Sequence, residues 1–264
     1  MSNKHGDFIW YELMTSDPDA AQEFYGPLLG WNFSDSGQKD RDYRIVSMND
    51  KGIGGLMKIP DGAPGPSCWM GYILVDDVDV SARSIKTAGG TIHMQPQDIP
   101  GAGRISFVTD PQGVMFYIMK PTPPAENPDL TSTAFAAIEP MIGHCAWNEL
   151  ATSDQAGAVD FYTNQFGWKQ EGDIDMGPMG TYQFFQHGPG MIGAVMTKPD
   201  EMPVSTWTYY FRVPNIDEAV TTTKANGGQI TLEPTEIPGG EFQVNGIDPQ
   251  GASFALVGPR KNEG

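Results

Sequence analysis

The sequence contains two copies of one pattern, and this repeat limits the possible fold more than any other feature. Matching motifs recur about 137 to 139 residues apart along most of the chain. Each copy opens with Trp-x-Glu-Leu, at Trp10–Leu13 and Trp147–Leu150, and closes with Asp-Pro-Gln-Gly, at Asp110–Gly113 and Asp248–Gly251. So many matches at a nearly constant spacing cannot arise by chance, so one structural unit must occur twice.

Within each copy, strand-like and helix-like patterns follow one another in a fixed order. In the first copy a strand over 8–14 precedes Asp17, a good helix N-cap, with Pro18 at the first helical position and Gly30 at the end. Further strands are expected over 32–34, 43–48 and 53–58. The scheme then recurs, with a strand over 70–75, a helix from Asp77 to the glycine pair 89–90, and strands over 91–94, 103–109 and 115–119. The pattern predicts an α+β fold in which a βαβββ module occurs four times.

A proline-rich segment separates the two copies. Residues 121–140 include four prolines among the first eight positions, which makes the start of the segment stiff and extended. We therefore predict a first domain over 1–120, a linker over 121–140 and a second domain over 141–264.

Charge and composition exclude several classes of function. The formal net charge of −17 leaves no basic footprint for nucleic acid and opposes binding to anionic membranes. Cys68 and Cys145 are the only cysteines and have no CxxC spacing, so neither a disulfide framework nor a thiolate metal site is expected. No apolar run is long enough for a signal peptide or a membrane span, so we expect a cytoplasmic protein. Monomer and homodimer both remain open.

Two motifs carry a resemblance to a known superfamily. Residues 17–31 read Asp-x-x-x-Ala-x-x-Phe-Tyr and then Leu-Gly-Trp, and both copies end in Asp-Pro-x-Gly before an apolar strand. In these motifs the chain resembles the vicinal oxygen chelate superfamily of glyoxalases, bleomycin-resistance proteins and extradiol dioxygenases. Its Trp-x-Glu-Leu openings are similar to a tandem two-domain branch with mycobacterial and antibiotic-biosynthesis members. The resemblance implies two glyoxalase-like domains, each with a curved, partly open mixed sheet whose concave face holds the site.

The resemblance also implies where a metal ion would be held. Metal-using members place His, Gln or Glu on four converging strands. In this chain those positions fall on or near non-ligating residues: Trp10 and Trp147, Gly55 and Ala194, Met70 and Thr208, and Tyr117 and Ala255. A divalent ion needs several nitrogen or oxygen donors, and an indole ring offers only an N–H. We therefore predict no metal site and no other cofactor.

Aromatic residues indicate a different kind of pocket. The first pocket is expected to include Trp10, Tyr43, Trp69 and Tyr117, and the second Trp147, Tyr182 and Trp207, with Phe254 as a further candidate. Aromatic walls suit flat, partly apolar ligands, with indole N–H and phenol O–H groups available for orientation. We predict metal-independent binding of a small aromatic or apolar molecule, for example an antibiotic. Phe24, Tyr25, Phe161, Tyr162, Trp31 and Trp168 are expected to pack the core instead.

Two glutamates support an alternative function. Glu12 and Glu149 lie two residues beyond Trp10 and Trp147, so strand alternation puts them on the same face. Either could act as an acid or base in a glyoxalase-like lyase or isomerase, or in an oxygenase of small-metabolite or antibiotic metabolism. Two further interpretations stay open. The carboxylates could simply be satisfied by backbone N–H groups or water, or the chain could be an interaction module with a vestigial pocket.

Overall fold

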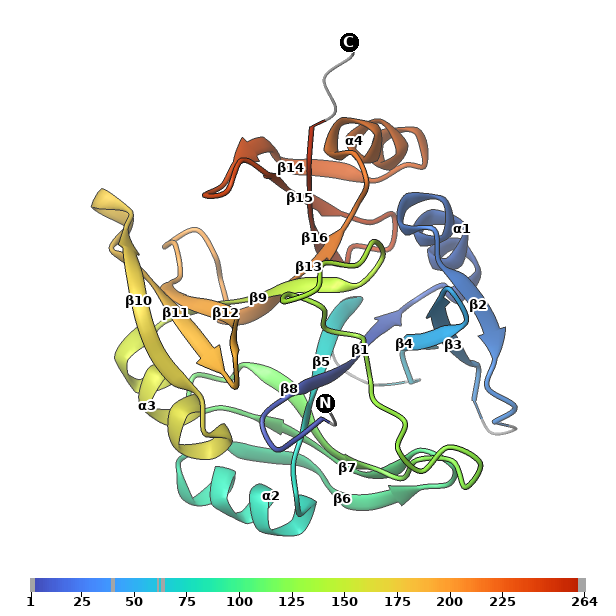
Figure 1. Ribbon diagram of the computed structural model, residues 1–264, viewed down its shortest axis with the longest axis vertical. Helices are drawn as coiled ribbons and strands as arrows, with labels where there is room; N and C mark the ends of the chain where they lie inside the picture. The colour runs from blue at the N-terminus through green and yellow to red at the C-terminus, as the bar shows by residue number, and fades with distance from the viewer. Residues whose placement is uncertain (1–2, 39–40, 61, 63–64, 261–264) are drawn as a thin grey trace. The chain divides into compact units, whose positions relative to one another are not determined.

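The computed structural model describes residues 3–38, 41–60, 62 and 65–260, and its strands form two eight-stranded mixed sheets (Figure 1). The first sheet has the order β2 (Asn32–Asp35), β3 (Tyr43–Met48), β4 (Lys51–Lys58), β1 (Phe8–Thr15), β5 (Cys68–Leu74), β8 (Met115–Pro121), β7 (Gly103–Thr109) and β6 (Thr91–Ile99). The second has the order β10 (Lys169–Asp175), β11 (Thr181–His187), β12 (Gly190–Thr197), β9 (Cys145–Thr152), β13 (Thr206–Arg212), β16 (Ser253–Gly258), β15 (Phe242–Ile247) and β14 (Gln229–Glu236). The predicted α+β fold of four βαβββ modules with open sheets is confirmed.

Each module contributes one α-helix: α1 (Pro18–Leu29), α2 (Val78–Thr87), α3 (Gln155–Phe166) and α4 (Ile216–Ala225). As predicted, the Asp17 carboxylate accepts a hydrogen bond from Ala20 N, and Gly30 ends α1 with φ 71°. A short 3₁₀ turn covers Gly177–Met179. In Figure 1, α2 lies along β6 and β7, and α4 lies along β14 and β15. Among the described residues, no helix combines the length and apolarity that crossing a bilayer requires.

The sixth strand is longer than the sequence pattern predicts. β6 extends to Ile99 instead of ending at residue 94, because it pairs with β7 as far as the Ile99–Gly103 contact. Two shifts in register, between Ile92 and Met94 and between Met94 and Gln97, let the strand pass Pro96. Proline is tolerated at such irregularities on an edge strand, so tertiary pairing overrides the local breaker.

The chain divides into two compact units, and each unit combines segments of both repeats. Unit 1 comprises residues 1–9, 70–132 and 148–207, and unit 2 comprises residues 10–69, 133–147 and 208–264. Helices α2 and α3 contact each other in unit 1, and α1 and α4 do so in unit 2. The predicted domains over 1–120 and 141–264, with a linker over 121–140, follow the sequence repeats, and their boundaries stay a prediction.

In unit 2, Tyr25 of α1 connects the characteristic motifs of the two repeats. Its Oη donates to Oδ2 of Asp248 at 3.0 Å and accepts from Nε1 of Trp69 at 3.1 Å. Burial, together with the charge of Asp248, raises the pKa of Tyr25 well above its usual value. The phenol therefore stays protonated and acts as the donor to the carboxylate. The Phe-Tyr motif of the first repeat thus binds the Asp-Pro-Gln-Gly turn of the second.

Unit 1 contains the reciprocal arrangement. Tyr162 Oη donates to Oδ2 of Asp110 at 3.1 Å and accepts from Nε1 of Trp207 at 3.1 Å. Backbone N–H groups of Gln112 and Val114 donate to the other carboxylate oxygen of Asp110. Every polar atom of this buried network that is named here has a partner, as buried polar groups require.

These two aspartates are expected to make stability depend on pH. Burial raises the pKa of Asp110 and of Asp248, although hydrogen bonds from turn N–H groups and from the tyrosines act in the opposite direction. Such a group contributes stability that is present below its unfolded pKa and lost as pH rises through its folded pKa. We therefore expect the difference in stability between Asp248→Asn, which cannot ionise, and the wild type to shift in favour of the variant as pH rises from about 4 towards neutrality. Urea denaturation across that range measures the difference, and a difference that does not change with pH would contradict the assignment.

Candidate functional site

On β1, the side chains alternate between an aromatic face and the core of unit 2. Tyr11 and Leu13 are buried in the core, and Trp10 points to the opposite face. There, Trp10 Nε1 donates a hydrogen bond to Tyr43 Oη, at the start of β3, over 3.0 Å. Both rings are half-buried. Two residues predicted for the first pocket are therefore in direct contact.

Gly55 makes room for this aromatic pair. In the sheet register it lies beside Glu12 of β1, and a Cβ added to it would overlap Tyr43 Oη and come within 3.2 Å of Trp10 Nε1. A larger residue would therefore displace the phenol. The resemblance puts a metal-ligand position near Gly55, so two rings lie close to where such a ligand's side chain would be.

The predicted acid–base residue Glu12 is buried on this face. Its side chain is only 2% exposed. Burial, and secondly the nearby charge of Glu12, raises the pKa of the Cys68 thiol to about 11. Cys68 therefore stays protonated at neutral pH and is not a nucleophile.

In the second repeat, the corresponding glutamate accepts a hydrogen bond from a tyrosine. Tyr182 Oη, at the position equivalent to Tyr43, donates to Oε2 of Glu149 over 2.8 Å. Both side chains lie in unit 1 and are half-buried. Ala194 is the strand neighbour of Glu149, as Gly55 is of Glu12. Both copies therefore place a tyrosine of this strand beside the Trp-x-Glu-Leu strand, through Trp10 in the first repeat and Glu149 in the second.

Trp69 and Trp207, which sequence analysis expected in the two pockets, pack against aromatic residues of the cores. Trp69 contacts Trp31 and Phe211 in unit 2, at ring-centroid distances of 5.7 and 5.0 Å. Trp207 contacts Trp168 and Tyr162 in unit 1, at 6.1 and 5.3 Å. Neighbouring residues on a strand point to opposite faces of the sheet. Trp69 and Trp207 therefore point away from the face that carries Met70 and Thr208, the residues near the positions where the resemblance puts metal ligands. We therefore assign both tryptophans to packing.

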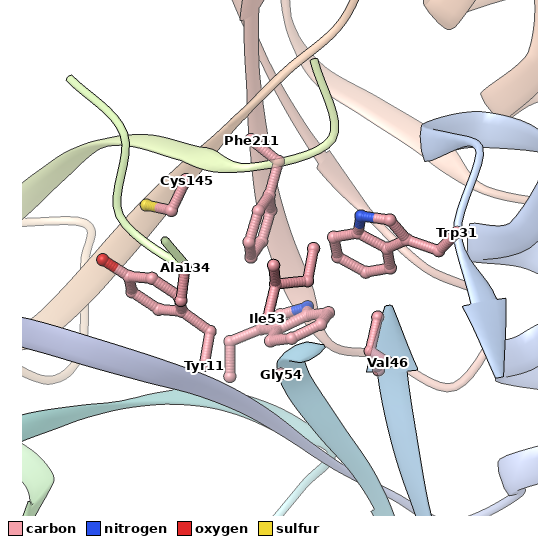
Figure 2. A pocket seen from close by; sticks show the side chains of 9 residues that line it. Tyr11, Trp31, Val46, Ile53, Gly54, Ala134, Cys145 and Phe211 are labelled. Carbon is pink, nitrogen blue, oxygen red and sulfur yellow. The ribbon is translucent and has the colours of Figure 1, made fainter. Parts of the chain in front are cut away.

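The aromatic residues that sequence analysis expected in the core are found there. Those that are less than one-tenth exposed are Phe24, Tyr25, Trp31, Phe161, Tyr162 and Trp168. Phe254, a further candidate for the second pocket, is 2% exposed and packs edge-on against Phe24 and Tyr25. Figure 2 shows the core of unit 2 around Tyr11, Trp31 and Phe211. The side chains around this apolar space leave no room for even a water molecule, so it is not a metabolite site.

Unit 1 contains a stack of aromatic rings that sequence analysis recognised only at Tyr117. The rings of Tyr72 and Tyr117, neighbours on β5 and β8, stack at 4.4 Å with an angle of 13° between their planes. Phe107 on β7 follows at 5.0 Å from Tyr117, and His93 on β6 at 5.3 Å from Phe107. We call these four residues the aromatic ladder. Tyr72 lies two residues beyond Met70 on β5, so strand alternation puts both side chains on the same face of the sheet. This spacing favours Tyr72 over Trp69 as a residue of the first pocket.

Trp147, also predicted for the second pocket, is partly buried and packs in unit 2 against an apolar cluster whose own residues are at most 8% exposed. It packs against Tyr210 of β13 and against Ala255 and Val257 of β16. We call these four residues the Trp147 face. Tyr210 and Ala255 are neighbours in the parallel β13–β16 pair, so their side chains point to the same side.

The residues at the family's metal-ligand positions do not fit a metal ion. Trp10 uses its only polar hydrogen on Tyr43, the rings cover Gly55, and Met70 is 1% exposed. Among the described residues, no group of three or more His, Cys, Asp or Glu side chains is placed to hold a metal ion. A divalent ion that loses its water needs such donors.

Comparison with known proteins agrees with this architecture. The model of the Glyoxalase/Bleomycin resistance protein/Dioxygenase superfamily matches residues 8–118 and again residues 141–256. The chain belongs to this superfamily. It is 32% identical to CFP32 of Mycobacterium bovis, a protein with a provisional glyoxylase name, over 97% of this chain and 96% of the relative. It is 28% identical to the anthracycline biosynthesis protein DnrV of Streptomyces peucetius, over 94% and 91% of the two chains.

Solved structures of other superfamily members share the fold. A Mn(II)-bound glyoxalase from Novosphingobium aromaticivorans matches with a TM-score of 0.66 and 15% identity, over 98% of this chain and 83% of that one. The 2,2',3-trihydroxybiphenyl 1,2-dioxygenase of Sphingomonas wittichii matches with a TM-score of 0.65 and 13% identity, over 97% and 91%. At such low identity these superfamily members share the fold alone with this chain.

Proposed function

We propose that this superfamily member binds a small aromatic or apolar molecule without a metal ion. The observation that carries the proposal is the hydrogen bond from Trp10 to Tyr43 above Gly55. This pair supports the proposal because its hydrogen-bonded rings lie close to the positions where the resemblance puts metal ligands. Affinity then comes from ring stacking and apolar burial.

Three surfaces provide the aromatic contact area. The Trp10–Tyr43 pair and the Trp147 face lie in unit 2, and the aromatic ladder lies in unit 1. A flat ring system can stack with the Tyr72–Tyr117 pair, whose planes are already within 13° of each other, so these two rings do not have to reorient on binding. Small-molecule ligands of this class, rather than macromolecules, are therefore the expected partners.

The test is a titration of EDTA-treated protein with 2-naphthamide, a flat neutral probe, followed by tryptophan fluorescence and calorimetry. We expect binding without added metal, and we expect Trp10→Leu and Trp147→Leu each to weaken it, by about tenfold where that surface contributes to binding. Trp10→Phe and Trp147→Phe are the matched controls, because they keep a ring and should retain most of the affinity. Binding that appears only after zinc, nickel, manganese or iron is added would refute the proposal.

A second candidate function is acid–base catalysis at Glu149. The observation that favours it is the 2.8 Å hydrogen bond from Tyr182, which joins two ionisable groups on one half-buried face. Such a pair can hold and return a proton in a lyase or isomerase reaction. If this candidate is right, Glu149→Gln abolishes glyoxalase-type turnover without changing the unfolding curve. Glu12→Gln tests the same role in the first repeat, and full turnover in the double variant discards the candidate.

A further inference from the structure

The loop between β14 and β15 is attached to the Trp147 face at both of its ends. This loop, residues 237–241, joins Glu236 to Phe242, which are neighbours in the hairpin. At one end Ile237 packs against the Trp147 face, and at the other Glu241 forms an ion pair with Arg212. At the exposed tip, two glycines at 239 and 240 have φ of +107° and +82°. Left-handed glycines at an exposed tip allow the loop to change conformation at low cost.

Arg212 lies at the edge of the Trp147 face and is nearly buried. On β13 it follows Tyr210 by two residues, so both side chains point to the same side, and its neighbour on β16 is Val257. Its side chain is 13% exposed and binds Glu241 through both guanidinium NH2 groups, with Nη2 to Oε2 at 2.9 Å. Arg212 Nε is buried without a hydrogen-bond partner in the part of the chain that the structure describes. A guanidinium in this position requires an anion, and it still has one N–H to offer.

The ion pair is not inherited from the repeated pattern. The positions equivalent to Arg212 and Glu241 in the first repeat are Leu74 and Gly103. The first repeat forms the corresponding β6–β7 hairpin with these residues and therefore without this ion pair. The first repeat has a different ion pair at this hairpin, Arg104 to Asp98 between β7 and β6, so what distinguishes the second repeat is the attachment of the loop to β13 through Arg212.

We propose that Glu241 occupies the place of a ligand carboxylate, and that the Trp147 face binds a flat apolar molecule that carries such a group. A ligand carboxylate would replace Glu241 on Arg212 and keep the planar two-point contact that a guanidinium makes with a carboxylate. The displaced Glu241 would move into water, where a third of its side chain already lies. The apolar part of this inference rests on the proposed function, and the carboxylate part rests on Arg212 alone.

The test compares 2-naphthoate with 2-naphthamide, which have the same ring system and differ in charge. For Glu241→Gln, which removes the internal competitor and keeps its shape, we expect the affinity for naphthoate to rise about tenfold relative to the affinity for naphthamide. For Arg212→Met, we expect the preference for naphthoate to disappear while naphthamide still binds. Arg212→Lys keeps the charge without the planar contact, and should retain only part of the preference.

Two further measurements test whether the change in affinity acts through the contact between Arg212 and Glu241. In the double variant Arg212→Met/Glu241→Gln, the gain from Glu241→Gln should vanish, since both changes act through one contact. Amide exchange should be faster in Glu241→Gln at Ile237 and Gly240, whose N–H groups form the hydrogen bonds within the loop.

The outcomes separate this inference from the proposed function. If both probes bind and neither Glu241→Gln nor Arg212→Lys changes the ratio of their affinities, the pair is purely structural and the inference is overturned. If neither probe binds to the wild type or to Glu241→Gln, the proposed function fails and the inference fails with it.

Discussion

Gly54→Ala is expected to destabilise the protein by about 3 kcal/mol. Gly54 of β4 is the parallel neighbour of Tyr11 of β1, and a Cβ added to Gly54 would overlap the carbonyl oxygen of Tyr11. The obstacle is backbone, so no side-chain rotation can relieve it, and β4 would have to move away from β1. The free energy of unfolding from urea titration measures the loss.

The same chain supplies a repeat of this experiment and a matched control. Gly193 of β12 faces the carbonyl oxygen of Asn148 in the same way, so Gly193→Ala should cause a loss of similar size. A Cβ on Gly52 would meet the Trp10 ring at 3.5 Å and Ile45 Cγ2 at 3.6 Å, both ordinary van der Waals distances. Gly52→Ala should therefore be neutral or stabilise by up to about 1 kcal/mol, because alanine restricts the unfolded chain. Equal effects at Gly52 and Gly54 would show that steric conflict is not the cause.

Tyr25→Phe is expected to lower the free energy of unfolding by about 2 kcal/mol. The change removes only a hydroxyl, but that hydroxyl serves Asp248 and Trp69 at once, within a buried network. Without it, one carboxylate oxygen and one indole N–H lose these hydrogen bonds away from water, and such groups are expensive to leave unpaired. Tyr162→Phe should have the same effect through Asp110 and Trp207.

Tyr43→Phe is the control for these two variants. Tyr43 is half-buried, so water can replace part of what its hydroxyl provides, and the expected loss is below about 1 kcal/mol. In addition, the effects of Tyr25→Phe and Asp248→Asn should not add, because both changes break one hydrogen bond. A loss under about 0.5 kcal/mol for Tyr25→Phe, or strict additivity with Asp248→Asn, would argue against the network.

The elements of the fold were predictable because their signals are local. Asp17, Pro18 and Gly30 mark the limits of α1 through capping and backbone preferences that act within a few residues. The strand β3 begins at Tyr43 and ends at Met48, as its pattern predicted. Pairing between strands moved the end of one element beyond its local signal. β6 continues past Pro96 because it pairs with β7.

The site was predictable only in part. The face to which a side chain points depends on its position along the strand, and its neighbours depend on which strands pair. The sequence brought Trp10 and Tyr43 into consideration, and the structure joins them by a hydrogen bond. The sequence analysis predicted Trp69 for the first pocket, whereas strand alternation favours Tyr72. A shift of one residue moves a side chain to the other face of the sheet. Arg212 and Glu241 carry no motif, so the sequence alone gave no reason to connect them.

By itself, the sequence determined the repeated module, its helix limits, its turns and its superfamily, because each of these rests on short-range chemistry copied along the chain. Tertiary structure alone decided that the compact units mix the two repeats, and that Tyr25 binds Asp248 while Tyr162 binds Asp110. The physical reason is that four similar modules have similar apolar surfaces. The pattern of each module shows which apolar side chains must be buried. Only the packing of the whole chain selects the module whose surface buries them.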